Sequence, residues 1–328
     1  MRIESVRGSL VESIHRVSAA VVDAGGRLVA RSGDPQFSSF LRSAAKPFQA
    51  MPLVADGVVE RFSMTQEELA LACSSHNSEP DQVARVQAFL DRVGCSESDL
   101  ACGPHRPLWR DLALPSEVKG MAEVPRTRVA SNCSGKHTGM LAFARHRGWE
   151  TRGYHEASHP VQRRCLEEMA RWSGMRTNDI GTAVDGCGVL CFAMPLDRMA
   201  VAFARLGGSD DKNVRTVTAA MMGHPELVAG RGRLCTALMQ AYPGKILVKV
   251  GAEGIYGAAL IEQGLGVGIK VEDGHAWAAC LALLSILQQL GLKPDPVERL
   301  APYAAMPIKN TRGEPVGLVR AAGDLTFI

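Results

Sequence analysis

Residues 246–271 read ILVKVGAEGIYGAALIEQGLGVGIKV and contain three short apolar segments separated by glycines. The segments are Ile246–Val250, Ile255–Ile261 and Leu265–Val271, and each has the length and composition of a β-strand. Connections of only a few residues join strands that run antiparallel, because a parallel connection needs a long crossover. This stretch therefore predicts an antiparallel sheet in the C-terminal third of the chain.

The same pattern occurs near the N-terminus. Val17–Val22 and Arg27–Ala30 are short β-compatible runs on either side of the turn sequence DAGG at residues 23–26. Val316–Val319 is one more strand candidate, close to the other end of the chain. We therefore expect a single antiparallel sheet of about five strands, to which both chain ends contribute.

Between these ends, from about residue 43 to 243, the apolar spacing is mostly helical. Thr65–Glu68 reads TQEE, a capping box that opens a helix. The other helix candidates are Asp81–Val93, His159–Met175, Leu196–Leu206, Val214–Met222, Leu234–Ala241 and Ala276–Leu290. A sheet from about 1–40 and 245–328, flanked by helices, predicts one α/β (α+β) domain over residues 1–328.

Composition excludes several classes of protein. The 328 residues carry 37 Lys+Arg and 34 Asp+Glu, a net charge of +3, and 46% are hydrophobic. This is too apolar for a disordered chain and too weakly basic for a dedicated nucleic-acid binder. The longest apolar run, Ala276–Leu287, is shorter than the roughly 20 residues of a membrane span. Nine scattered cysteines and an N-terminus without a signal-peptide pattern predict a reducing, cytoplasmic location.

Ser43–Lys46 has the pattern Ser-x-x-Lys, in which a helix places the hydroxyl and the amine on one face. A desolvated lysine amine can take the serine proton and so produce a nucleophile. Two further copies, Ser116–Lys119 and Ser209–Lys212, lie among charged residues, where the lysine would stay protonated. Pro47 is tolerated only in a first helical turn, so Ser43 is expected at a helix N-terminus. On the pattern alone, Ser43 is a candidate nucleophile or simply a helix cap.

Two other places carry polar groups in an apolar context. Lys249 lies within a predicted strand and is followed two residues later by Gly251, which would let a ligand approach the backbone. The alternative is an edge-strand lysine that faces water. Residues 73–77, CSSHN, follow a predicted helix and form either a loop that presents hydroxyls or a C-cap turn.

The segments SNCSGKH at residues 131–137 and DGCG at residues 185–188 are expected to be glycine-containing loops that carry one cysteine each. Cysteines on such loops are not core thiols, and thiolates from two loops could together bind Zn²⁺. No Cys-x-x-Cys pair supports this, so a metal site is only one of the possible interpretations.

These motifs together resemble the class 3, rhizobial-type L-asparaginases. The resemblance rests on residues 42–47 (RSAAKP), 73–76 (CSSH), 131–137 (SNCSGKH), 185–188 (DGCG) and 249–254 (KVGAEG). Five motifs in one order are far more specific than Ser-x-x-Lys alone. The resemblance implies a fold like that of the serine β-lactamases and the glutaminases, and it implies a homodimer.

The resemblance also implies a site for catalysis and metal binding. It pairs Ser43 with Lys46 and Ser75 with Lys249, and it places Zn²⁺ on Cys133, Lys136 and Cys187. Lys270 on a neighbouring strand is the alternative to Lys249. We favour Lys249, because a strand lysine followed by glycine at i+2 is what this fold places against the nucleophile.

The reaction implied is hydrolysis of the side-chain amide of L-asparagine to L-aspartate and ammonia. Ser43 would attack with Lys46 as general base, and Ser75 held by Lys249 would pass a proton to the leaving ammonia. Backbone N–H groups at Ser43 and near Ala252 would stabilise the oxyanion. The substrate-binding candidates are Arg42, Asp185 and Ala252, with Arg106 as the alternative cation.

Three other functions remain open at this point. A glutaminase would use the same chemistry. A β-lactamase-like enzyme would also do so and should carry Ser-x-Asn, which Ser75 and Asn77 formally provide. A non-catalytic zinc-binding protein would use both lysines structurally.

Overall fold

The computed structural model describes residues 1–292 and 299–328. Within them the main sheet comprises β1 (Arg2–Arg7), β2 (Leu10–Asp23), β3 (Leu28–Ser32), β7 (Ile246–Gly251), β8 (Ile255–Leu260), β9 (Leu265–Val271), β10 (Met306–Lys309), β11 (Pro315–Ala322) and β12 (Thr326–Phe327). The strand order is β10-β11-β1-β2-β9-β8-β7, while β3 pairs with β2 and with β12. Every pairing is antiparallel.

The expected sheet built from both chain ends is confirmed, and so are the predicted strands within it. The expected number of about five strands is wrong, because the sheet has nine in the part of the chain that the structure describes. The strands β1 (RIESVR) and β10 (MPIK) mix charged with apolar residues, and β12 has only two residues. Such short segments lack the apolar run that identifies a strand in a sequence.

The described helices are α1 (Lys46–Ala55), α2 (Val58–Phe62), α3 (Gln66–Ala72), α4 (Pro80–Arg92), α5 (Trp109–Leu112), α6 (Ser134–His146), α7 (Pro160–Ser173), α8 (Leu196–Gly208), α9 (Lys212–Gly223), α10 (Pro225–Val228), α11 (Leu234–Ala241), α12 (Ala276–Gln289) and α13 (Ala301–Ala304). Short 3₁₀ helices are η1 (Arg42–Ala45), η2 (Glu97–Asp99) and η3 (Thr177–Asp179). The predicted capping box is present at Thr65 and Glu68. None of the described helices has the length and apolar character needed to cross a bilayer.

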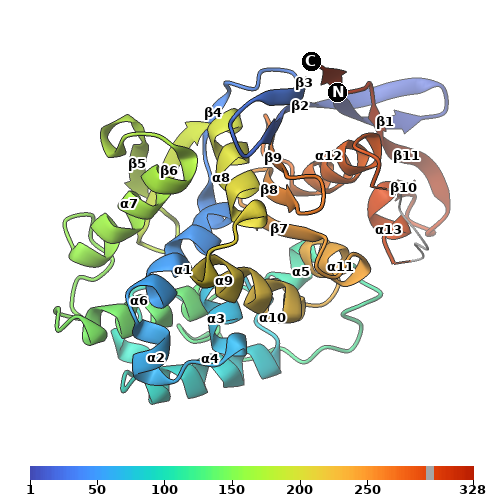
Figure 1. Cartoon of the computed structure of the whole chain (residues 1–328). Coiled ribbons are helices and arrows are strands. Elements are labelled where there is room, and N and C mark those ends of the chain that lie inside the picture. The colour runs from blue at the N-terminus through green and yellow to red at the C-terminus, as the bar shows by residue number, and fades with distance from the viewer. Residues whose placement is uncertain (293–298) are drawn as a thin grey trace.

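Two helices cover opposite faces of the main sheet. The Tyr256 hydroxyl contacts Cys280 of α12, whereas a Cβ on the next residue, Gly257, would overlap Phe203 of α8. Successive residues of a strand point to opposite faces, so α12 and α8 enclose the sheet between them. Apart from α13, which lies beside α12, the remaining helices form a second part of the molecule beside β7, which is the edge strand (Figure 1). The boundary between β7 and this helical part holds the site.

The middle of the chain is less uniformly helical than expected. It contains a second, three-stranded sheet of β4 (Ser38–Phe40), β6 (Leu190–Pro195) and β5 (Gly181–Val184), in the order β4-β6-β5. The predicted loop over residues 131–137 is also wrong in part, because α6 begins at Ser134. Cys133 is the N-cap residue of α6 and is buried, so it does not lie on a flexible loop.

Candidate active site

Ser43 lies where the chain turns sharply into a helix. It belongs to η1, which runs directly into α1, and Pro47 occupies the first turn of α1 as predicted. The preceding residue, Arg42, has a φ of 50°, a left-handed conformation that costs free energy in a non-glycine residue and clusters at functional sites. Among the described residues, the Ser43 hydroxyl has no hydrogen-bond partner. Ser43 is therefore a helix-start serine with a free hydroxyl, not a helix cap.

Ser75 occupies the point where two buried lysines meet. Its Oγ atom lies 2.9 Å from Nζ of Lys46 and 2.9 Å from Nζ of Lys249. Lys46 also donates to the Ser74 carbonyl, and Lys249 donates to the Val250 carbonyl at 3.0 Å. Three of the four residues expected to form two Ser–Lys pairs thus form one connected group centred on Ser75.

Lys249 is held in a wholly buried position on the edge strand β7. Burial, followed by the nearby Lys46 cation, lowers the pKa of Lys249 to about 7. An amine with this pKa is substantially unprotonated at neutral pH, and it can then accept the proton of the Ser75 hydroxyl. The predicted strand lysine therefore has the electrostatic properties of a general base.

Gly251 has a packing role that differs from the expected one. A Cβ at this residue would lie 2.4 Å from the carbonyl oxygen of Leu41, just before η1. The chain itself, and not a ligand, therefore occupies the space that the missing side chain leaves. This close approach brings β7, with Lys249, against the segment that carries Ser43 and Lys46.

Lys270, the alternative to Lys249, lies elsewhere. Its Nζ atom donates to the carbonyls of Val271 and Glu272 at the end of β9. Lys270 therefore holds the turn after β9 and has no contact with either serine.

A pocket of about 240 Å³ adjoins the group of Ser75, Lys46 and Lys249, because it is lined by Ser43 and by Cys133, whose Sγ contacts Lys46. Its walls combine residues 42–43, 103–105, 131–133, 185–187 and Ala252. Arg42 Nε donates to Asp185 Oδ1 at 2.7 Å on this wall, so two of the predicted substrate-binding residues form an ion pair there. Ala252, the third, lines the same pocket, whereas the alternative cation Arg106 is exposed and pairs with Asp111. Ser43 is the candidate nucleophile whose side chain borders this space.

The predicted zinc ligands also come together. Lys136 Nζ lies 3.0 Å from Cys187 Sγ, and the thiols of Cys187 and Cys133 share a hydrogen bond. That hydrogen bond and the Lys136 cation lower the pKa of Cys187, against the opposing effect of burial. We call Cys133, Lys136 and Cys187 the sulfur group, and Ser75, Lys46 and Lys249 the Ser–Lys group. Cys133 Sγ lies 3.1 Å from Nζ of Lys46, so the two groups adjoin.

Cys133, Lys136 and Cys187 are the residues that would have to bind a zinc ion here. In the described part of the chain, no three His, Cys, Asp or Glu side chains form a metal-binding group. A zinc ion here would therefore need the Lys136 amine as third ligand beside the two thiolates. The two cysteine sulfurs and the adjoining pocket fit a zinc site with an open position, while the Lys136 amine could serve as third ligand only after losing its proton.

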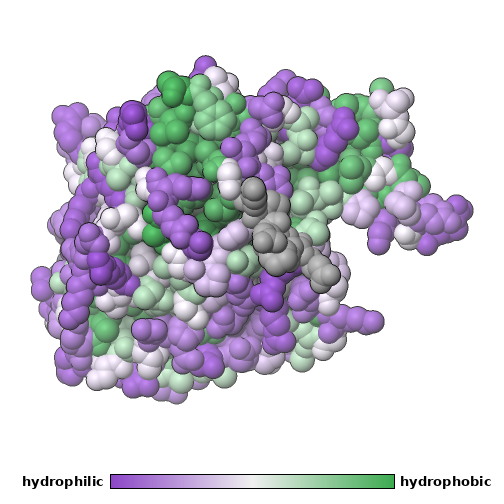
Figure 2. Space-filling model, turned by 45° about the vertical axis from the view of Figure 1, so that its right-hand side comes forward, coloured by the Kyte–Doolittle hydropathy of each residue, from purple (hydrophilic) through white to green (hydrophobic). Residues whose placement is uncertain are grey.

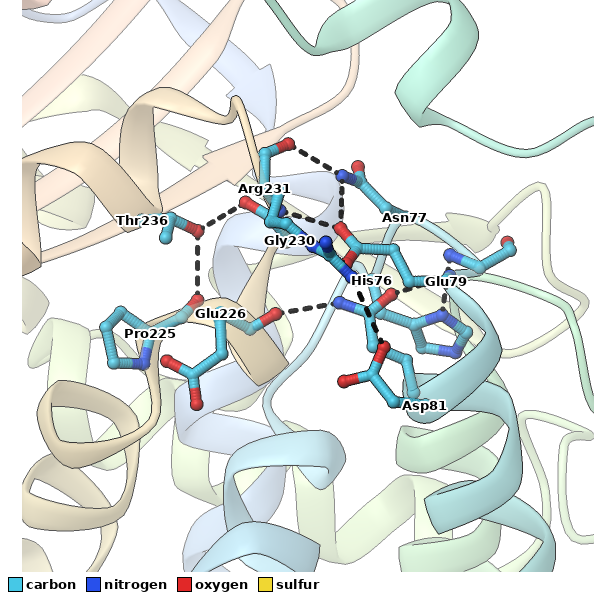
Figure 3. A network of polar contacts seen from close by, with 11 residues as sticks. His76, Asn77, Glu79, Asp81, Pro225, Glu226, Gly230, Arg231 and Thr236 are labelled. Carbon is cyan, nitrogen blue, oxygen red and sulfur yellow. Dashed lines mark hydrogen bonds and ion pairs between the residues drawn. The ribbon is translucent and has the colours of Figure 1, made fainter. Parts of the chain in front are cut away.

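A polar network that the sequence analysis missed holds the Ser75 loop in place (Figure 3). Glu79, buried beside that loop, accepts hydrogen bonds from the amide and side chain of Arg231 at 2.7 and 2.8 Å. Asn77 Nδ2 bridges Glu79 Oε1 and the Arg231 carbonyl at 3.0 and 2.9 Å. Ser75 N donates to the Val228 carbonyl at 2.9 Å. These partners lie about 150 residues apart in the chain, so no local pattern could indicate them.

His105 is a second residue that the sequence analysis missed. It lines the pocket, and its Nε2 accepts a hydrogen bond from the Asn132 amide at 2.7 Å. It follows no motif, because residues 101–108 form an irregular segment whose composition is typical of a surface loop.

Comparison with known proteins identifies the family of the chain. The model of the family described as L-asparaginase II matches residues 3–321. No curated protein matches the chain. Similar solved structures include Mglu in its native form, at 14% identity and a TM-score of 0.47, covering 90% of this chain and 69% of that one. A β-lactamase from Mycobacterium bovis has 14% identity and a TM-score of 0.32, covering 80% of this chain and 90% of that one. Because the family model extends over nearly the whole chain, the protein belongs to the L-asparaginase II family and is an amidohydrolase.

Proposed function

We propose that the protein is an L-asparaginase, which hydrolyses the side-chain amide of L-asparagine to L-aspartate and ammonia. The observation that carries this proposal is a serine hydroxyl 2.9 Å from each of two buried lysine amines, next to a pocket that Ser43 and Cys133 line. The Arg42–Asp185 pair on the pocket wall offers one charge for the α-carboxylate of an amino acid and one for its ammonium group. A free amino acid with a short side-chain amide matches this combination.

In the proposed reaction, Ser43 Oγ forms a bond to the amide carbon and the C–N bond breaks. Lys46 accepts the serine proton while Lys249 is unprotonated, so that no second cation opposes the transfer. Ser75 gives its own proton to the leaving nitrogen and receives one from Lys46, so that ammonia departs. Water then attacks the ester, aspartate leaves, and Ser43 regains its proton. Backbone N–H groups at Ser43 and Ala252 stabilise the oxyanion in both steps.

Zinc is part of the proposal. Cys133, Cys187 and Lys136 would hold it, and a bound zinc ion would supply positive charge at the pocket wall. The chain already contains a serine nucleophile and lysine bases, so the proposed role of the three ligands is to fix the two segments that carry them.

The proposed enzyme forms a homodimer and acts in the cytoplasm. Large apolar side chains are exposed at Leu10 and Ile14 of β2 and at Leu318 of β11, although hydrophilic residues cover most of the lower part of the face in Figure 2. These strands are where a second copy would bury apolar surface. Light scattering should give twice the chain mass, and Ile14→Lys should reduce it.

The proposed activity is tested by measuring ammonia release from L-asparagine and L-glutamine, together with cleavage of a chromogenic β-lactam, with and without a chelator. We expect asparagine to be the preferred substrate. Preference for glutamine or for the β-lactam would replace the proposed function with one of the alternatives, and inactivity toward all three would leave only a binding function.

The roles of the two serines need their own experiment. Ser43→Ala should lower turnover below about a hundredth of wild type, because the nucleophile is lost. Rapid quenching followed by mass spectrometry should find the acyl group on the peptide that contains Ser43. An acyl group on the Ser75 peptide would reverse the two roles. Ser75 would then be the nucleophile, activated by its contacts with both lysines.

A further inference from the structure

Arg233 is a buried cation that the proposed mechanism does not use. It precedes α11 and is only 4% exposed. Its guanidinium donates to Asn77 Oδ1 at 3.0 Å, which is a bond to a neutral amide. Arginine keeps its charge at any ordinary pH, so burial without a counter-ion is unfavourable.

Among the other buried charges outside the Ser–Lys and sulfur groups, Lys270 is held by two backbone carbonyls and the carboxylates are paired with arginines. The buried carboxylates Glu4, Glu68, Glu79 and Glu168 each form an ion pair with at least one arginine. Arg233, in contrast, has no carboxylate oxygen within 4.0 Å among residues 1–292 and 299–328. The missing partner of this cation is an anion.

Arg233 borders a pocket of about 200 Å³ that is separate from the pocket next to Ser43. The walls are the turn at residues 250–254, Leu112 of α5, Tyr256 of β8 and Trp277 of α12, with small α12 residues between them. The two pockets share Ala252 alone. Apart from Arg233 and Glu253, every wall residue is uncharged.

A larger hollow of about 440 Å³ also borders Arg233, but its walls are more polar. Arg231 and Arg299 line it together with Glu117 and Glu226, so cations and carboxylates there already offset one another and an apolar body finds less to pack against. In the smaller pocket the apolar walls weaken screening, which strengthens a guanidinium–carboxylate pair. Glu253 there is exposed, at the turn, and disfavours a ligand with a second negative charge.

We propose that the pocket between Arg233, Trp277 and the turn at residues 250–254 binds a small monocarboxylate with an apolar body. The carboxylate pairs with Arg233, and the apolar body packs against Leu112, Tyr256 and Trp277. This site is additional to the proposed amide-hydrolysing site, and its occupancy does not depend on that activity.

Phenylacetate is a suitable probe and 2-phenylethanol is its uncharged counterpart. Calorimetry on the full chain should detect phenylacetate binding, and the fluorescence of Trp277 can follow it. The uncharged 2-phenylethanol should bind at least about tenfold more weakly than phenylacetate. Arg233→Gln, which keeps a donor for Asn77, should remove this preference for the charged ligand. Equal binding of the two compounds, or no binding of either, would overturn the proposal.

Three further variants test whether a folding defect or binding at another location explains the result. Leu112→Trp should fill the pocket and abolish phenylacetate binding without touching the Arg233–Asn77 contact. Arg299→Gln in the larger hollow and Arg42→Gln in the Ser43 pocket are the matched controls and should leave binding within about twofold. If either control abolishes binding, or if Leu112→Trp preserves it, the ligand binds elsewhere and the proposal is wrong.

Discussion

Lys249 and Lys270 look alike in sequence and differ in what surrounds them. Both lie on strands of one sheet, and both are buried, with exposed fractions of 0% and 6%. Lys249 contacts the Ser75 hydroxyl on the edge strand β7, whereas Lys270 bonds backbone carbonyls on β9, which lies between β2 and β8. Only the edge strand faces the helical part that carries the serines. The place of a strand in the sheet therefore decides which lysine can do chemistry.

The charges around the two lysines differ in the same way. Burial and the cations Lys46 and Arg233 lower the pKa of Lys249 to about 7. Burial also lowers the pKa of Lys270, but Glu253 and Asp273 oppose the shift. A lysine among cations becomes a base at neutral pH, whereas the carboxylates near Lys270 favour its protonated form.

The largest expected effect is that of Lys249→Met. Methionine has a similar volume but no amine, so the variant should lose about 10³-fold in kcat/KM for L-asparagine, within the range usual for general acid–base catalysis. Steady-state ammonia release measures it. Retention of more than a tenth of wild-type activity would remove Lys249 from the proposed chemistry.

Stability supplies the control for that variant. Between pH 7 and the ordinary lysine pKa, the unfolded chain holds a proton on Lys249 that the folded chain does not, so this residue lowers stability most below pH 7. Lys249→Met should therefore have a Tm equal to or above that of wild type at pH 6, with a smaller gain at pH 10. A lower Tm at pH 6 would show that the loss of activity reflects damage to the fold.

The next effect in size concerns the pH profile. If unprotonated Lys249 is required, kcat/KM should fall about tenfold for each pH unit below about 7, as the amine gains its proton. A flat profile between pH 5.5 and 8 would contradict the proposed role. The same measurement on Lys270→Met should give an unchanged inflection.

Lys136 extends the comparison to a third buried lysine, whose contact is a sulfur atom. Cys187→Ala removes that contact. We expect the purified variant to lose the one zinc per chain proposed for the wild type and to raise KM about tenfold, with turnover partly retained. Full zinc retention on metal analysis would exclude Cys187 as a ligand. Complete loss of turnover in a folded variant would assign the metal a part in the chemistry.

The smallest effect is expected for Lys270→Met. Its amine has no serine contact, so kcat/KM should stay within about threefold of wild type. The turn after β9 loses the bonds to two carbonyls, so thermal unfolding should shift by a few degrees at most. An inactive Lys270→Met beside an active Lys249→Met would refute the strand assignment.

The sequence predicted the elements whose signals are local. The helix over Leu234–Ala241 has the predicted bounds, and α3 has its capping box. The motif residues Lys46, Ser75 and Lys249 also meet, although the pattern had paired Lys46 with Ser43. Local composition cannot show which hydroxyl a long side chain reaches, because Lys46 extends away from its own turn to Ser75, 29 residues further along.

What the sequence did not predict depends on distant partners or on residues with weak propensity. Glycine and lysine follow Ser134 in α6, and glycine has low helix propensity, so this stretch resembled a loop. A Cβ at Gly135 would lie 2.3 Å from the Leu71 carbonyl, which shows that packing against α3 requires glycine there. The ion pair of Glu79 with Arg231 could not be predicted from the sequence either, because the two residues are far apart in the chain and meet only in the folded structure.

The use of both chain ends in one sheet has a consequence for synthesis on the ribosome. The amino group of Met1 bonds Ser32 Oγ at 2.8 Å, and the Ile328 amide donates to the Val29 carbonyl at 2.9 Å, so both termini lie beside β3 (Figure 1). The strands β1 and β2 must wait for β11 and β9, which are translated much later, and they expose unpaired edges meanwhile. A chain of this design is vulnerable to aggregation while it is nascent. Joining its adjacent ends, with new termini in the exposed loop at Asp210–Asp211, would let β9 and β2 emerge closer in time and shorten that exposure.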